Sequence, residues 1–274
     1  MPPLESSFKF ATLAAPAGFE LRKPAPLAAG RRPRHLAVIL DGNGRWATAK
    51  GLPRLAGHVK GVEAVREIIS GCLAHRIEVL SLYAFSAFNW RRPADEVRGL
   101  MGLFQHYLAS EAPRLKALGI RLRLLGEREQ LPLEVKEALG TAEALTSDGT
   151  RMALNLAVNY GGREEIVGAV RRLGGLVASG QLDPQSIDAR HFEAGLFTRD
   201  LPPVDLMVRT AGERRISNFL LWQSAYAELL FMDVLWPDFT LEHLDAALAD
   251  YATRRRTFGG LVDQVLQAEA TGEK

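Results

Sequence analysis

Six short apolar runs recur along the chain, and stretches with helical spacing separate most of them. The runs are LAVIL (36–40), IEVLSLYAF (77–85), IRLRLLG (120–126), MALNLAVN (152–159), VDLMVRT (204–210) and ELLFMDVLW (228–236). Apolar residues recur at helical spacing in the intervening residues 59–73, 96–118 and 163–178. Strands that alternate with helices predict the α/β class, with a central, mostly parallel six-stranded sheet flanked by helices. Neither a linker nor a repeat divides residues 35–260, so we expect a single domain.

The first 34 residues differ in composition from the rest of the chain. They are rich in alanine and proline and hold six basic residues against two acidic ones, although the whole 274-residue chain carries a formal net charge of +2. We therefore predict a basic, poorly ordered arm over residues 1–34 and a folded domain over residues 35–274. A solvated tail is the simpler interpretation of the arm, and contact with anionic lipid is the functional one.

The overall composition argues against several classes of protein. The net charge is too small for general nucleic-acid binding. The single cysteine, Cys72, excludes a disulfide within the chain and a cysteine-based zinc site. A secretory pattern is missing from the N-terminus, and Gln223, Glu228 and Asp233 interrupt the most apolar later window. We therefore expect a cytoplasmic protein without a membrane span.

Polar, mostly glycine-containing segments directly follow four of the six predicted strands. They are Asp41–Arg45, Ser86–Trp90, Asn159–Arg163 and Arg209–Glu213. In parallel sheets, ligands bind outside the carboxyl ends of the strands, which all meet at one edge. The sequence therefore predicts that these four segments converge on a single binding site.

The residue types in these segments favour a phosphate-containing ligand. Arginine presents a planar fork that matches phosphate oxygens, and five arginines lie in or near the segments, namely Arg45, Arg54, Arg92, Arg209 and Arg215. His58 lies at the start of the predicted helix 59–73, where free backbone N–H groups favour an anion. For any single residue, a solvated side chain or a helix cap is the simpler interpretation. Taken together, the group predicts a phosphate or diphosphate site.

Two carboxylates lie next to predicted buried strands and need cationic partners. Asp41 follows the first apolar run, and Glu228 opens the sixth. An isolated buried carboxylate is costly. Mg²⁺ is one candidate partner, because it takes one or two protein carboxylates together with phosphate oxygens and water. An ion pair with a neighbouring arginine is the alternative, and the residues alone leave both open.

The glycines that follow Asp41 only loosely match known nucleotide loops. The chain lacks GxxxxGK[ST], whereas GNGRWA fits GxGxxA after a strand. Asp41 precedes the glycines, however, where its charge opposes a bare pyrophosphate, and the second strand does not end in an acid that could hold a ribose. These features favour a metal-bound diphosphate over a nucleotide. Nearby apolar residues form either core or a pocket for an apolar chain: Leu100, Leu103, Phe104 and Leu108.

Six segments, in order, carry a family resemblance: HLAVILDGNGRWA, GHVKG, SLYAFSAFNWRRPADEV, NLAVNYGGREEI, DLMVRTAGERRISNFLLWQSAYAELLFMDVLWPDF and FGG. Over about residues 35–260 the chain resembles the cis-prenyltransferases, the undecaprenyl diphosphate synthase family. The resemblance implies a Mg²⁺-dependent transferase that condenses isopentenyl diphosphate with an allylic diphosphate, expected to be farnesyl diphosphate, to give Z-prenyl diphosphates. Residues 35–274 would be its catalytic domain, with an apolar tunnel for the prenyl chain. The expected product is the long-chain lipid carrier precursor, undecaprenyl diphosphate, for cell-wall synthesis.

The resemblance also implies roles for individual residues. It assigns Asp41 to Mg²⁺ binding and catalysis, Glu228 to the metal, and Asn89 to proton acceptance with Ser86 beside it. Because a neutral amide is a weak base, we expect Asn89 to relay or orient while a diphosphate oxygen takes the proton. The implied substrate-binding residues are Gly42, Asn43, Gly44, Arg45, Trp46, Arg54, His58, Ser86, Ala87, Phe88, Trp90, Arg92, Arg209, Arg215, Ile216, Ser217, Gly259 and Gly260.

The resemblance further implies partners. The family is homodimeric, and Gly259 and Gly260 match a late segment that reaches the neighbouring site. A lipid product implies transient contact with a membrane surface for delivery, although the sequence shows no anchor. Nucleic acid is not an expected partner.

Four positions depart from the family pattern or affect product length. Phe88 replaces a residue that is usually acidic, and Thr257 replaces a usual arginine. Ala84 is small where a bulky residue shortens the product, whereas Val158 is larger than the common alanine, so product length stays open. A short-chain Z-prenyl diphosphate synthase and a non-catalytic partner subunit are the alternatives. Most of the matched residues are retained, which argues against the second.

Overall fold

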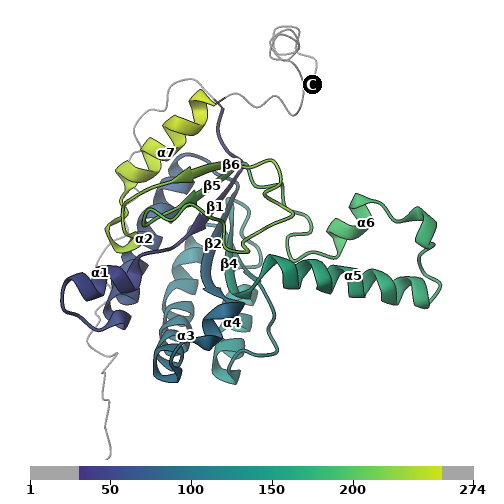
Figure 1. Cartoon of the computed structure of the whole chain (residues 1–274), viewed down its shortest axis with the longest axis horizontal. Helices are drawn as coiled ribbons and strands as arrows, with labels where there is room; N and C mark the ends of the chain where they lie inside the picture. Colours follow the sequence, from purple (N-terminus) through teal and green to yellow (C-terminus); the bar gives the residue numbers. More distant parts are fainter. Residues whose placement is uncertain (1–30, 255–274) are drawn as a thin grey trace, which may run out of the picture.

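Six strands form one sheet in the computed structural model, which describes residues 31–254 (Figure 1). The strands are β1 (His35–Ile39), β2 (Val79–Ser86), β3 (Ile120–Leu125), β4 (Met152–Tyr160), β5 (Leu206–Arg209) and β6 (Glu228–Phe231). Their order across the sheet is β3-β4-β2-β1-β5-β6. The predicted α/β class and all six predicted strands are confirmed. The sheet is parallel throughout rather than mostly parallel.

The last two strands are shorter than the apolar runs predicted. β5 and β6 each keep four residues. After Phe231 the chain turns across the edge of the sheet, where the backbone N–H groups of Ala211 and Gly212 donate to the carbonyls of Val234 and Met232. Residues 232–236, which include Asp233 among apolar neighbours, therefore close the end of the sheet instead of lengthening β6.

Seven helices are described in residues 31–254. They are α1 (Asn43–Ala49), α2 (Arg54–Ala74), α3 (Ala94–Ala117), α4 (Leu133–Leu145), α5 (Gly162–Ala178), α6 (Ala189–Ala194) and α7 (Leu241–Thr253). The predicted helices at 59–73, 96–118 and 163–178 are thereby confirmed. Helices α2, α3 and α4 each begin directly after a proline, whose fixed φ suits the entry into a helix. Among these helices, none combines the length and the apolar character needed to cross a bilayer.

The two faces of the sheet are covered differently. In β1, Leu36 and Val38 point to the face that packs against α2, α3, α4 and α7. Ala37 and Ile39 point to the opposite face, which Phe219 and its neighbours cover from the turns between β5 and β6. Helices α5 and α6 extend sideways from the sheet (Figure 1). Most of the helical packing therefore lies on one face.

The strand order reverses beside β1, which fixes where a ligand can bind. β1 pairs with β2 on one side and with β5 on the other. In such sheets a crevice opens beyond the carboxyl ends of the strands at the reversal. Asp41 follows β1, and Arg209 ends β5, so both residues lie at this crevice. The predicted polar segments follow β1, β2, β4 and β5 and reach the same edge of the sheet.

Candidate active site

The carboxylate of Asp41 is held at the end of β1 by neighbouring donors. Its Oδ1 accepts from the backbone N–H of Gly42 at 2.8 Å, and its Oδ2 accepts from Arg209 Nη2 at 2.8 Å. Arg45 Nη2 lies 3.7 Å from Oδ1. Thr210 fixes the backbone, since its hydroxyl donates to the Asp41 carbonyl at 2.7 Å. The side chain is still 33% exposed, so a ligand can reach this carboxylate.

Arg209 organises the turn that follows β5. Its side chain is 5% exposed, and Nη1 donates to Ser217 Oγ at 2.6 Å and to the carbonyl of Arg215 at 2.5 Å. A buried guanidinium needs an anion nearby, and Asp41 supplies it here. The arginine thus joins the ends of β1 and β5 to the turn that carries Ser217.

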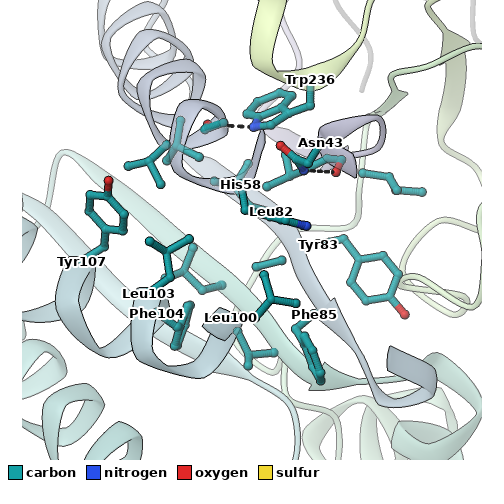
Figure 2. Close-up of a pocket in the computed structure, with 18 of the residues that line it drawn as sticks. Asn43, His58, Leu82, Tyr83, Phe85, Leu100, Leu103, Phe104, Tyr107 and Trp236 are labelled. Atoms are coloured by element: carbon teal, nitrogen blue, oxygen red, sulfur yellow. Dashed lines mark hydrogen bonds between the residues drawn. The ribbon is translucent and has the colours of Figure 1, made fainter. Parts of the chain in front are cut away.

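Glycines allow close approach around α1. Gly42 has a φ of +109°, which favours glycine, and an added Cβ would lie 3.0 Å from Leu235. At Gly61 on α2, an added Cβ would lie 2.4 Å from Asn43 Oδ1. Trp236 Nε1 donates to the Gly61 carbonyl at 2.9 Å, so α1, α2 and Trp236 meet tightly (Figure 2). The buried Oδ1 of Asn43 has no hydrogen-bond partner among the described residues.

His58 lies on the first turns of α2 beside Asn43 (Figure 2). Burial lowers the pKa of His58 to about 4, and the nearby Arg92 and Arg54 act in the same direction against Glu96. The imidazole is therefore neutral at pH 7. Its buried Nε2 has no hydrogen-bond partner in residues 31–254, so this ring nitrogen is available to a ligand group.

Glu96 on α3 orients two of the predicted arginines. Its Oε2 accepts from Arg54 Nε at 3.2 Å, and its Oε1 accepts from Arg92 Nη1 at 3.1 Å. Without such a carboxylate, two arginines beside neutral His58 would repel each other. The arrangement keeps Arg54 and Arg92 at the start of α2 and α3, next to the end of the sheet.

Asn89 and Ser86 cap the short 3-10 helix η2 (Ala87–Arg91) reciprocally. The backbone N–H of Ser86 donates to Asn89 Oδ1 at 3.0 Å, and the N–H of Phe88 donates to Ser86 Oγ at 3.2 Å. The amide oxygen of Asn89 is thus used by the backbone, which leaves its NH₂ group for other partners. Phe88 is 52% exposed and lies against Arg91, whose guanidinium is 5.0 Å from the ring centre.

A cavity of about 670 Å³ opens from these polar groups and runs between the sheet and helices α2 and α3. Leu82 and Phe85 from β2 face Leu100, Leu103 and Phe104 from α3 across it (Figure 2). We call its polar end the mouth, lined by Asp41, Asn43, His58, Arg209 and Ser217. We call its opposite end the far end, lined by Ile69, Leu115, Leu122 and Leu154. A charged head group fits the mouth, and a hydrocarbon chain fits the remainder.

Most predicted site residues lie at the mouth, but several contribute there only indirectly. The residues that line the cavity are Asp41, Asn43, His58, Ser86, Phe88, Asn89, Arg92, Arg209 and Ser217. The others lie beside it: Gly42, Gly44, Arg45, Arg54, Ala87 and Arg215. Ala84 and Val158, which were predicted to affect product length, both line the cavity.

Three predicted substrate-binding residues are engaged in packing. Trp46 Nε1 donates to Asp238 Oδ1 at 2.8 Å, and Lys50 lies over the ring. Trp90 Nε1 donates to Asn159 Oδ1 at 2.7 Å, and its ring packs on Phe85. Ile216 packs against the core on the second face of the sheet. The structure does not place these three side chains in the cavity wall.

Within the described chain, Glu228 lies at the opposite edge of the sheet from Asp41. Glu228 opens β6, opposite Leu206, whereas Asp41 lies beyond the opposite, carboxyl end of the strands. With about 3.3 Å per residue, the two ends of these strands are about 10 Å apart. Arg254 Nη1 pairs with Glu228 Oε2 at 3.1 Å. Within one chain, the predicted second metal carboxylate therefore has an arginine partner instead. Gly259 and Gly260 lie outside the described residues.

Sequence reasoning missed Thr210, Glu96, Gly61 and Trp236, although all four shape the mouth. Thr210 could have been found because it directly follows a predicted site arginine and places a hydroxyl at the end of a strand. Glu96, in the first turn of α3, could have been found because it lies four residues after Arg92, close enough in the chain for an ion pair. Gly61 and Trp236 are far apart in the chain, so their contact left no local pattern.

Comparison with known proteins identifies a family. The profile of the family described as "Putative undecaprenyl diphosphate synthase" matches residues 39–259. An isoprenyl transferase from Zymomonas mobilis is 51% identical over 229 residues, which cover 84% of this chain and 92% of that protein. A Pseudomonas aeruginosa protein is 50% identical over 238 residues, which cover 87% of this chain and 94% of that protein. It is named ditrans,polycis-undecaprenyl-diphosphate synthase ((2E,6E)-farnesyl-diphosphate specific).

The fold is also similar to that of a solved enzyme. The crystal structure of lavandulyl diphosphate synthase from Lavandula x intermedia, in complex with dimethylallyl diphosphate, matches with a TM-score of 0.81 and 38% identity. The match covers 83% of this chain and 98% of that one.

Proposed function

The chain belongs to the undecaprenyl diphosphate synthase family, the cis-prenyltransferases, and we propose that it condenses isopentenyl diphosphate with farnesyl diphosphate. The products are Z-prenyl diphosphates, and the chain is a transferase. The names of the Pseudomonas relatives specify farnesyl diphosphate, which supports this primer. We propose undecaprenyl diphosphate, the lipid carrier precursor for cell-wall synthesis, as the main product.

The main support for this proposal is that a single cavity has a polar mouth and an apolar interior. Asp41, Arg209, His58 and Ser217 line the same cavity as the leucines and phenylalanines of β2 and α3. An allylic diphosphate has the same two parts, a charged head and a hydrocarbon tail. Its diphosphate would lie among the donors of the mouth while its tail occupies the space beside α3.

The donors at the mouth fall into two groups that fit two diphosphates. His58, Arg54 and the residues of α1 lie on one side of Asp41, as expected for the allylic diphosphate. Arg209, Arg215 and Ser217 lie on the other, as expected for isopentenyl diphosphate. Holding the two substrates side by side aligns their reacting carbons, which is a large part of the rate that an enzyme can supply.

Mg²⁺ fits the mouth through Asp41. The carboxylate is partly exposed, and the buried Asn43 Oδ1 close by lacks a hydrogen-bond partner in residues 31–254. Mg²⁺ is commonly held by one or two carboxylates, with substrate phosphates and water completing its shell. A group of three or more acidic, histidine or cysteine ligands is absent from the described residues, so substrate oxygens would supply most of the ligands. When bound, the ion would neutralise charge on the departing diphosphate.

Asn89 would act by orientation rather than as a base. Because its amide oxygen accepts from the Ser86 backbone, its NH₂ group is the part directed to a ligand. That group can donate to a diphosphate oxygen and hold it toward the proton that leaves the isopentenyl unit. The diphosphate oxygen then accepts the proton.

We also propose that the chain forms a homodimer and meets the membrane transiently to deliver its product. Helix α5 extends from the sheet, and Val167 (47% exposed) and Val170 (56% exposed) lie three residues apart on one side of it, where a second copy could cover them. The family enzymes are named for catalysis, and Asp41 and Arg209 are in place here, so a non-catalytic partner subunit is disfavoured.

The direct test uses purified protein, Mg²⁺, farnesyl diphosphate and labelled isopentenyl diphosphate. Chromatography of the dephosphorylated products should show chains longer than farnesol, and EDTA should abolish them. The same reaction with dimethylallyl diphosphate reports whether a shorter primer is accepted. If neither primer is elongated in the presence of Mg²⁺, the proposed activity is wrong.

A further inference from the structure

An ion pair lies in the wall of the apolar cavity, away from the mouth. Arg66 on α2 and Glu111 on α3 both line the cavity. Arg66 donates to Glu111 Oε1 from Nε at 3.1 Å and from Nη2 at 2.5 Å, and Arg114 lies 3.4 Å from Glu111 Oε2. The Arg66 and Glu111 side chains are 15% and 18% exposed, so both retain limited contact with water. The pair connects the two helices between which the cavity runs.

The pair lies close to the far end of the cavity. Helices α2 and α3 both begin at the mouth edge of the sheet and end before β2 and β3, at the opposite edge. Arg66 follows His58 by eight residues, which is about 12 Å along a helix. Ile69 at the far end follows Arg66 by three residues, and Leu115 follows Glu111 by four. The charges therefore lie about one helical turn before the far end.

Helix α3 lacks one backbone hydrogen bond close to the Arg66–Glu111 pair. Pro113 lies inside α3, two residues after Glu111. Proline has no N–H, so the helix lacks the bond that residue 113 would donate to the carbonyl of Ala109. With one backbone hydrogen bond fewer, α3 depends more on side-chain contacts to hold its position near Pro113. The Arg66–Glu111 ion pair is one such contact. Tyr107, one turn earlier, has its ring 5.9 Å from the Arg66 guanidinium.

We propose that the Arg66–Glu111 pair limits how far the prenyl chain can grow and thereby sets product length. This inference rests on the proposed function. Each added isoprene unit buries more hydrocarbon in the cavity, which favours elongation. A chain that reaches the pair removes the remaining water from two charges, and that desolvation opposes further advance. The pair is thus a specificity determinant that stops the chain before the far end is filled.

The test compares product lengths from full-length variants, with Mg²⁺, farnesyl diphosphate and excess labelled isopentenyl diphosphate. Arg66→Met/Glu111→Leu replaces the pair by apolar side chains, and the most abundant product should shift by one or more isoprene units toward longer chains. Arg66→Gln/Glu111→Gln removes both charges with smaller changes in packing and should shift it in the same direction. Arg66→Lys keeps a positive charge opposite Glu111 and should retain wild-type length.

The matched control is Glu78→Gln. Arg34 donates to both oxygens of Glu78, at 3.0 and 2.9 Å, but this exposed pair does not line the cavity. Its loss should leave the product distribution unchanged. Thermal unfolding of each variant identifies any that fail to fold, and either of the two charge-free variants is sufficient to decide the question.

The outcomes separate this inference from the proposed function. Wild-type protein that elongates neither primer contradicts the proposed function itself. Wild-type protein that elongates, together with folded charge-free variants that give the same lengths, overturns the role of the pair. Leu154→Ala enlarges the far end without touching the charges. If Leu154→Ala lengthens the products as much as removal of the pair does, the apolar residues at the far end set the length and the inference is wrong.

Discussion

Two arginine–carboxylate pairs line the same cavity, one at each end. Asp41 and Arg209 meet at the mouth, and Arg66 and Glu111 meet near the far end. The chemistry of the two pairs is the same, but their surroundings differ. Arg209 also holds Ser217 and a backbone carbonyl in the turn after β5, whereas Arg66 has Glu111 as its anionic partner between two helices. What an arginine–carboxylate pair can do therefore depends on the groups around it.

The backbone also differs between the two ends. Four non-glycine residues in the turn after β5 have positive φ values, namely Ala211 (71°), Ser217 (47°), Asn218 (65°) and Leu220 (45°). The Arg66–Glu111 pair lies in regular helix. Strained conformations persist only where surrounding contacts hold them, and they concentrate at functional sites. The mouth is therefore suited to exchanging partners with a ligand, and the far end to holding two helices in place.

The largest difference between the ends should appear when each carboxylate is removed. Asp41→Ala should lower kcat/KM by about 10²- to 10³-fold, because it deletes the proposed metal-binding group and the anion that pairs with Arg209. The variant should remain folded by circular dichroism. Glu111→Gln, the counterpart at the far end, should lower kcat/KM less than about tenfold. Unchanged turnover in Asp41→Ala would refute the role of this carboxylate.

Low pH should lower the free energy of unfolding through a residue of the mouth, because His58 is the histidine that lines the described cavity. Burial lowers its pKa from 6.5 to about 4, so between these values the unfolded chain binds a proton that the folded chain does not. The free energy of unfolding should be insensitive to this group above pH 6.5. It should fall as the pH drops from 6.5 to about 4, by up to about 3 kcal/mol.

Urea unfolding as a function of pH measures this effect. His58→Gln should flatten the slope between pH 6.5 and 4. His35, the first residue of β1, is buried outside the cavity lining, and burial lowers its pKa to about 4 as well, so His35→Gln should flatten the slope to a similar extent. A His58→Gln variant with the full wild-type slope would show that this ring does not titrate as described.

Replacing each arginine by lysine should separate the two pairs more finely. Lysine is a point charge and cannot reproduce the planar contacts that Arg209 makes with Asp41, Ser217 and a carbonyl. Arg209→Lys should therefore lower kcat/KM for isopentenyl diphosphate by about ten- to a hundredfold, or about 1.4 to 2.7 kcal/mol. Arg66→Lys keeps a charge opposite Glu111 and should cost less than about threefold. Equal losses would mean that the two pairs do not differ in the way proposed.

The smallest effects are expected from two substitutions in opposite directions, alanine to glycine in the turn after β5 and glycine to alanine in α3. Ala211 has a φ of +71°, so Ala211→Gly should stabilise the fold by about 0.5 to 1 kcal/mol. Gly102 lies inside α3 with open space around its Cα, so Gly102→Ala should stabilise it by about the same amount. Melting temperatures measure both. A lower melting temperature for Ala211→Gly would mean that its methyl contacts outweigh the backbone strain.

The sequence predicted the mouth better than the far end. The segments that carry Asp41 and Arg209 were expected to converge because both follow strands of one parallel sheet, and the apolar runs identified those strands. The position of Glu228 was not anticipated, because a residue that opens a parallel strand lies at the opposite edge of the sheet from one that ends a strand. Arg66 and Glu111 were not predicted, since spacing along one helix does not reveal which turn of another helix it meets.

Trp236 connects helix α2 to the end of β1. Its indole N–H holds the carbonyl of Gly61 on α2, and its backbone N–H holds the carbonyl of Asp41 at 3.0 Å. A shift of α2 at Arg66 would therefore act, through Trp236, on the backbone of Asp41, the proposed metal-binding residue. For anyone redesigning product length, the practical result is a trade-off: variants selected for longer chains should also change their affinity for the primer.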